Sequence, residues 1–264
     1  MGEERQHSVL SVSDLTVGYR NRKHQYAVAF GIDFELEKGT LTGLVGANGI
    51  GKSTLLRTLC GMQPPLAGKM ELYGKDIGKH SSMELATRLS IVLTEPPASK
   101  NLTVRELVTL GRQPYTNGFG MLTDKDREVI RHALEITESS SLSDRKCYEL
   151  SDGQLQRVVI ARALAQDTDL VILDEPTTHL DLYHRAYVLK LLKRLTTETG
   201  KTILFSTHEI DLAIQLSDKL IVMDVEKTFV GTANQLISDG RFDALFPTET
   251  IYFDPENGRF TIKN

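Results

Sequence analysis

The sequence contains no tryptophan, only two cysteines, and no long run of apolar residues. Cys60 and Cys147 stand far apart, so we expect no disulfide framework and favour a reducing compartment. No stretch approaches the roughly 20 apolar residues that a membrane-spanning helix needs. The first residues, 1–5, are not followed by the apolar core of a signal peptide. These absences predict a cytoplasmic protein that meets a membrane only from outside the lipid.

An excess of positive charge is also missing. The chain carries 31 Lys and Arg against 35 Asp and Glu, for a net charge of -4. Proteins that bind nucleic acid through its phosphates need a concentrated basic surface, so nucleic acid is not an expected partner. With 264 residues and 40% apolar content, the chain is long enough to bury a sizeable core as a globular protein.

Two kinds of strand pattern are present. Residues 8–37 alternate apolar and polar side chains, as half-buried strands do, and predict an antiparallel edge region. Four later runs are short and almost continuously apolar, which is typical of parallel strands covered by helices on both faces. These runs are 41–45, 170–173, 203–205 and 220–223.

Helical patterns lie between the strand runs. Ser81 with Glu84 and Thr103 with Glu106 fit the capping box that begins a helix. A helical stripe runs through Ile130, Ala133, Leu134 and Thr137, and another helix is expected from about 181 to 199, ending at Gly200.

The organisation predicted from these patterns is one domain spanning 1–264. The core comprises 1–95 and 159–264, and residues 96–158 form an inserted helical subdomain that contains no strand. A loop is expected at 116–121 within the insertion. The last twenty residues suggest a short-stranded appendage, to which the sequence gives no role. The fold class is therefore α/β, with a mostly parallel sheet covered by helices.

The segment 46–53 matches the phosphate-binding pattern G-x-x-x-x-G-K-S. A buried strand precedes it and a helical pattern follows it, which places backbone N–H groups and a positive helix end around an anion. We expect Lys52 to meet the β- and γ-phosphates of ATP and the Ser53 hydroxyl to bind Mg²⁺; the alternative is a chance match in a glycine-rich turn. The predicted ATP contacts are Gly46, Ala47, Asn48, Gly49, Ile50, Gly51, Lys52, Ser53 and Thr54.

Two acids end the apolar run at 170–173. Because side chains alternate along a strand, Asp174 and Glu175 should face opposite ways and take separate roles. Asp174 is placed to join the Mg²⁺ shell, and Glu175 to polarise the water that attacks the γ-phosphate. The alternative is a pair of solvated turn residues before Pro176.

The segment 150–157, Leu-Ser-Asp-Gly-Gln-Leu-Gln-Arg, resembles the signature motif of ATP-binding-cassette (ABC) ATPases. Further landmarks of that family follow the same order: a tyrosine at Tyr19, the loop 177–181, and a histidine at His208 after Ser206-Thr207. The resemblance runs from about residue 10 to about 230. It implies an ABC-type phosphate-loop ATPase core.

In the family, the signature segment belongs to the second subunit of a head-to-tail dimer and closes over the γ-phosphate of the first. The resemblance therefore implies a homodimer in which Ser151, Asp152, Gly153 and Gln154 contact the partner's ATP. It also implies that Asp181, in the loop 177–181, contacts nucleotide. Ser151 can equally serve as the cap of the following helix. Asp152 replaces the glycine that is most common at its position.

The resemblance suggests three further roles. His208 would reach the γ-phosphate and orient Glu175 or the water, where a structural histidine is the alternative. Tyr19 would stack on adenine, unless it is merely packed or exposed. Glu95 falls where the family normally has a glutamine that contacts Mg²⁺ or water; it can bind Mg²⁺ through oxygen, or be only a surface residue before Pro96.

Residues 107–115 resemble the corresponding segment of ATPases from importers of ferric siderophores, haem and cobalamin. The resemblance implies the ATP-hydrolysing subunit of such an importer, driven by homodimer closure, with ferric siderophore or haem as the first expectation and cobalamin as the alternative. Its partners would be integral-membrane permease subunits and, indirectly, a substrate-binding protein, at the cytoplasmic face of the membrane. The competing hypothesis is a soluble ATP-switched assembly or nucleic-acid-remodelling factor.

Overall fold

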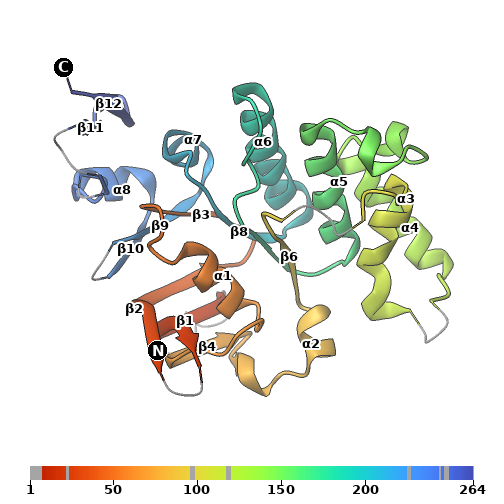
Figure 1. The fold of residues 1–264 in the computed structure, drawn as a ribbon, viewed down its shortest axis with the longest axis horizontal. Coiled ribbons are helices and arrows are strands. Elements are labelled where there is room, and N and C mark those ends of the chain that lie inside the picture. Colours follow the sequence, from red (N-terminus) through yellow and green to blue (C-terminus); the bar gives the residue numbers. More distant parts are fainter. Residues whose placement is uncertain are drawn as a thin grey trace.

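The computed structural model describes residues 8–21, 24–95, 99–116, 120–224, 227–243, 245–246 and 250–263. Figure 1 shows a β-rich body near the N-terminus, a central sheet with helices, and a group of helices beyond it. Several positions named above lie outside the described residues. They are the N-terminal stretch 1–5, Pro96, and residues 117–119 of the expected loop.

The first sheet is antiparallel, as the alternating pattern predicts. Its strands lie in the order β2-β1-β4-β5, and β1 pairs with β2 and β4 in antiparallel register. The inward side chains of β1, including Leu10, Val12, Leu15 and Val17, are buried. The strands are β1 (Ser8–Arg20), β2 (Gln25–Glu37), β4 (Ala67–Leu72) and β5 (Lys75–Asp76).

The second sheet has the order β10-β9-β3-β8-β7-β6. Its pairs are parallel except for β10, which runs antiparallel to β9. The four continuous apolar runs form β3, β7, β8 and β9, which confirms the predicted parallel sheet. Two edge strands, β6 and β10, were not anticipated. The bounds are β3 (Leu41–Gly46), β6 (Leu89–Val92), β7 (Leu170–Leu173), β8 (Thr202–Ser206), β9 (Lys219–Met223) and β10 (Thr228–Gly231).

Both faces of this sheet are buried, as alternate residues of β7 illustrate. Val171 and Leu173 join one apolar cluster with helices, whereas Leu170 and Ile172 join a second cluster with the first sheet. The phosphate loop leads from β3 into α1 (Lys52–Leu59). The other core helices are α2 (Ser82–Ala86), α6 (Leu182–Thr199), α7 (Ile210–Leu216), α8 (Ala233–Ser238) and the 3-10 turn η2 (Ile77–Lys79).

The insertion is helical, and its described residues between 99 and 158 contain no named strand. Its elements are α3 (Val104–Thr109), η3 (Leu110–Tyr115), α4 (Asp124–Ile136), η4 (Ser140–Leu142), η5 (Cys147–Glu149) and α5 (Asp152–Ala165). In Figure 1, α3, α4 and α5 gather beyond β6 and α6. Both expected capping boxes are present. Helix α5 crosses the boundary expected at residue 158, so one continuous helix joins the insertion to the core.

The chain ends in a hairpin of β11 (Ile251–Asp254) and β12 (Arg259–Ile262). Phe253 is buried and its ring stacks on Phe242 at 4.9 Å, so the hairpin is fixed to the body. Cys60 and Cys147 are buried free thiols. Within the described ranges, none of the helices combines the length and apolar character needed to cross a membrane.

Candidate nucleotide site

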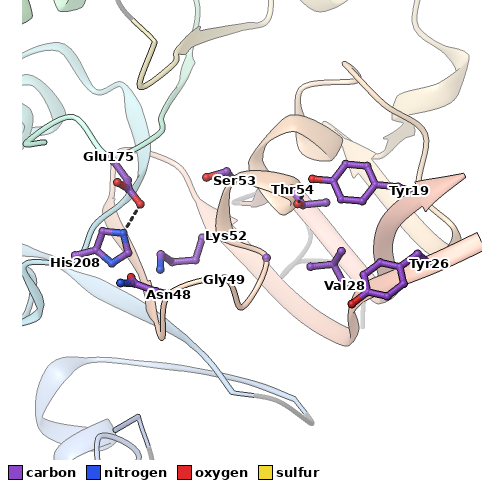
Figure 2. A pocket seen from close by; sticks show the side chains of 11 residues that line it. Tyr19, Tyr26, Val28, Asn48, Gly49, Lys52, Ser53, Thr54, Glu175 and His208 are labelled. Atoms are coloured by element: carbon purple, nitrogen blue, oxygen red, sulfur yellow. Dashed lines mark hydrogen bonds and ion pairs between the residues drawn. The ribbon is translucent and has the colours of Figure 1, made fainter.

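One pocket of about 510 Å³ gathers residues from four separate parts of the chain. It lies along the loop between β3 and α1, with the ends of β1 and β2 on one side and the segments after β7 and β8 on the other (Figure 2). Its lining residues are Tyr19, Tyr26, Val28, Asn48, Gly49, Gly51, Lys52, Ser53, Thr54, Glu175 and His208. Nine of these are among the residues expected to bind or hydrolyse ATP.

The loop itself depends on glycine backbone angles. Gly49 and Gly51 have φ of 78° and 109°, angles that residues with a side chain rarely adopt. Gly51 is the N-cap residue of α1, and it has no side chain to bind the first amides of the helix. Such unpaired N–H groups at a helix start favour an anion. The geometry fits the phosphate site that the sequence predicts.

Lys52 supplies a buried cation. Its side-chain nitrogen donates to the carbonyl oxygens of Gly46 at 2.9 Å and Ala47 at 3.2 Å. Burial lowers the pKa of Lys52 below its usual value, and the nearby charges of Glu175 and Asp174 oppose that change. The ammonium group is therefore held in place by its own loop, beside two carboxylates.

Asp174 connects the phosphate loop to strand β8. Its Oδ1 accepts a hydrogen bond from Ser53 at 3.1 Å and another from Ser206 at 2.8 Å. The Ser206 hydroxyl in turn accepts from the backbone N–H of Glu175 at 2.9 Å. The carboxylate is buried next to a hydroxyl, and hard oxygen donors of this kind suit Mg²⁺. The described residues hold no group of three or more His, Cys, Asp or Glu that would form a closed metal cage.

Glu175 and Asp174 contact different partners, as their separate predicted roles require, although Glu175 lies beyond the end of β7 at Leu173 and strand alternation does not set its direction. Its Oε1 pairs with Nε2 of His208, and its Oε2 accepts from the Thr178 hydroxyl at 3.1 Å. Figure 2 shows this pair at the end of the pocket beyond Lys52. Glu175 also has a φ of 49°, and a left-handed backbone at a residue other than glycine is often retained at functional sites.

The opposite end of the pocket is aromatic. The hydroxyls of Tyr19 and Thr54 share a hydrogen bond of 3.1 Å. Tyr26 and Val28 also line this end, and both were missed because β2 was interpreted only as a strand. The signal was available in the hairpin register, since Tyr19 pairs with Tyr26 across β1 and β2.

The signature residues do not line this pocket. Ser151 caps α5 by accepting from the N–H of Gln154 at 3.3 Å, the capping role that was the alternative. Gly153 is buried against α6, where an added Cβ would lie 2.5 Å from His184 Cδ2. Asp181 caps α6 and accepts from the N–H of His184 at 2.8 Å.

Glu95 also lies elsewhere. Its carboxylate pairs with Arg57 at 3.2 Å, and 74% of its side chain is exposed. It lines a separate pocket of about 270 Å³ together with Asp152 and Thr178. The structure therefore gives Glu95 an ion-pair partner on α1 and does not bring it among the residues that line the larger pocket.

Comparison with known proteins covers nearly the whole chain. A family model described as ABC transporter matches residues 30–178. The iron(3+)-hydroxamate import ATP-binding protein FhuC of Bacillus subtilis is 39% identical over 252 residues, which span 95% of this chain and 92% of that protein.

Two solved structures share the fold. The structure of cbiO1 from Clostridium perfringens, part of the ABC transporter complex cbiONQ, has a TM-score of 0.78 and 28% identity, covering 89% of this chain and 92% of that one. The dimeric structure of MJ0796, a bacterial ABC transporter cassette, has a TM-score of 0.73 and 25% identity, covering 85% and 98%.

Proposed function

Because this chain belongs to the ATP-binding-cassette family of transporter ATPases, we propose that it hydrolyses ATP to power an importer of ferric hydroxamate or a related iron chelate. One observation carries the catalytic part of the proposal. A single pocket combines a buried lysine in a phosphate loop, a hydroxyl bonded to a carboxylate, and a second carboxylate paired with a histidine.

Each group has a role that its position supports. Lys52 neutralises charge on the β- and γ-phosphates, and its two carbonyl contacts keep the ammonium where those phosphates enter. Glu175 accepts a proton from the attacking water. His208 holds the Glu175 carboxylate and donates toward the γ-phosphate. Positioned groups of this kind account for most catalysis of phosphoryl transfer, because little covalent chemistry falls to the protein.

We also propose that Mg²⁺ accompanies the nucleotide. Ser53 and Asp174 would hold it through oxygen, in the pairing the structure already gives these side chains. When bound, the ion would neutralise charge on the phosphates during transfer. Glu95 would take part only by giving up its contact with Arg57.

The second half of each hydrolytic site would come from another copy of the chain. Ser151 to Gln154 and Asp181 lie outside the pocket of their own chain, and the MJ0796 cassette is described as dimeric. We propose a head-to-tail homodimer in which these residues close over the partner's ATP. Because Ser151 already caps α5, its hydroxyl stands at the positive end of a helix of 14 residues, which suits a phosphate oxygen.

Closure of that dimer would drive a membrane-embedded permease. The similar protein from Bacillus subtilis is an iron(3+)-hydroxamate import protein, which favours a ferric siderophore over haem or cobalamin as cargo. We propose that the chain docks peripherally at the cytoplasmic face of the membrane, with a substrate-binding protein acting on the other side.

Glu175→Gln tests the catalytic proposal. The variant keeps its shape and loses the proton acceptor, so we expect turnover to fall by roughly 10²- to 10⁴-fold, while ATP still binds and an ATP-bound dimer accumulates in light scattering. Glu198→Gln, on the exposed face of α6, is the matched control. Wild-type turnover in Glu175→Gln would remove Glu175 as the base.

Uptake of radiolabelled ferric hydroxamate tests the cargo separately. A strain that lacks this chain should lose uptake, which the wild-type chain restores and Glu175→Gln does not. Normal uptake in the deleted strain would eliminate this cargo and leave the ATPase assignment intact.

A further inference from the structure

Tyr26 is an exposed aromatic residue with a fixed place in the nucleotide pocket. It lines the pocket with 70% of its surface exposed, and Tyr19 lines it with 54% exposed. Tyrosine is intermediate in burial, but two exposed tyrosine rings at one end of a ligand pocket present a large apolar area to whatever binds there.

The hairpin sets both tyrosines on the same side. Tyr19 and Tyr26 are directly paired in the antiparallel register of β1 and β2, and directly opposed residues project to the same face of a sheet. Figure 2 shows both rings pointing toward the pocket and lying apart from each other. Tyr19 and Tyr26 therefore form two walls of this end of the pocket.

A close contact between the backbones of β1 and β2 fixes the positions of Tyr19 and Tyr26. At Gly18 an added Cβ would lie 2.1 Å from the carbonyl oxygen of Tyr26 and 2.9 Å from Cα of Ala27. The register also shifts between Val17 and Gly18. Only glycine fits at position 18, because the backbones of the two strands lie in close contact next to the tyrosine pair.

Both walls are also tied to the phosphate loop. Tyr19 is hydrogen-bonded to Thr54 on α1. On the other strand, Val28 packs so closely on Gly51 that an added Cβ there would lie 2.9 Å from the Val28 side chain. The distance between the aromatic end of the pocket and the phosphate-binding loop with Lys52 is therefore fixed by these contacts.

We propose that Tyr26 forms the second wall of the nucleobase site, so that the base of ATP is held between Tyr19 and Tyr26. The inference rests on the proposed binding of ATP in this pocket and adds a residue to it. Stacking between a base and an aromatic ring is strong and tolerant of base identity. Tyr26 should therefore raise affinity for purine nucleotides as a class and contribute nothing to binding of the phosphates.

Calorimetry on the full chain separates the base from the phosphates. Loss of one stacking partner should weaken ATP and GTP about tenfold in Tyr26→Ala, while inorganic tripolyphosphate competes as in the wild type. Tyr26→Phe should retain near wild-type affinity, because the ring is kept. Tyr252→Ala, which removes an exposed tyrosine of the C-terminal hairpin, is the matched control.

The outcomes distinguish this inference from the proposed function. If ATP affinity in Tyr26→Ala stays within twofold of wild type, Tyr26 does not stack on the base. An equal loss of affinity for ATP and tripolyphosphate also refutes the inference, because it would indicate a disturbed phosphate loop. If the wild type binds neither ligand, or if Lys52→Ala leaves both affinities unchanged, the nucleotide site itself fails. Because the chain has no tryptophan, tyrosine emission gives a second readout, and its quenching by ATP should shrink in Tyr26→Phe.

Discussion

Replacing Arg112 by methionine should destabilise the protein strongly, although Arg112 lies outside the catalytic pocket. Its Nε donates to Asp126 at 2.9 Å, with only 3% and 4% of the two side chains exposed. The same guanidinium donates to the Ala165 carbonyl at 2.8 Å and lies 3.9 Å from the Tyr115 ring centroid. The substitution fills similar space but leaves a buried carboxylate without its cation.

The size of the effect follows from what Asp126 retains. Removal of one partner from a buried ion pair costs about 3–5 kcal/mol. Asp126 still accepts from the Thr123 amide at 2.8 Å and hydroxyl at 2.6 Å, which places the loss near the lower end, about 3 kcal/mol. A cost of that size lowers Tm by roughly 6–12 °C in a domain of this length. Arg131→Met removes exposed ion pairs on α4 and should leave the Tm nearly unchanged, because solvent screens such pairs.

The pH dependence gives a second check. Hydrogen bonds from Thr123, followed by Arg112, hold the pKa of Asp126 at about 2, although burial acts in the opposite direction. A lowered carboxyl pKa contributes stability above the unfolded value of about 3.9 and loses it as pH falls from there toward 2. Without Arg112 the pKa of Asp126 rises, so the difference between variant and wild type should shrink below about pH 4.

Urea unfolding followed by circular dichroism measures both effects. A destabilisation under about 1 kcal/mol at pH 7, or a difference that stays constant between pH 5 and pH 3, would refute the reasoning.

Three further predictions concern the two motifs and the pocket. Gly153→Ala should change stability by less than about 1 kcal/mol in urea unfolding, because its Cβ meets only the half-exposed His184 side chain, which can turn aside, and alanine favours the helix; a larger loss would show that the His184 ring is held in place. Ser53→Ala should raise the Mg²⁺ concentration for half-maximal ATPase activity about tenfold. An unchanged Mg²⁺ titration would show that Ser53 is not a ligand of the ion. His208→Ala should lower the turnover rate at least tenfold with little change in ATP affinity in calorimetry; a loss confined to affinity would contradict its role beside Glu175.

The sequence predicted best the parts whose determinants are local. The phosphate loop follows from consecutive residues, and the strands β3, β7, β8 and β9 follow from apolar runs buried on both faces. The edge strands β6 and β10 escaped prediction because neither is a continuous apolar run: Ser90 interrupts β6, and β10 begins with Thr228, ends with Gly231 and has no fully buried residue.

Residues whose roles depend on distant contacts were harder to predict. Tyr26 lines the pocket because of the register between β1 and β2, and no short sequence motif encodes that register. Glu95 was assigned by its place along the chain, whereas its side-chain contact is set by Arg57 on α1, which the local pattern does not show. The packing of Gly153 against His184 likewise joins two residues about thirty positions apart in sequence, one on each of two helices.

Helix α5 gives the inserted subdomain a mechanical property. At about 1.5 Å per residue, its 14 residues form a rod roughly 21 Å long that begins at the Ser151 cap. Its other end is locked to η3, since the Ala165 carbonyl accepts from Arg112 and an added Cβ at Gly111 would lie 2.3 Å from the Arg162 carbonyl. Because η3 and α5 are held together at this end, we expect a displacement of η3 to move α5 with it and so to shift Ser151.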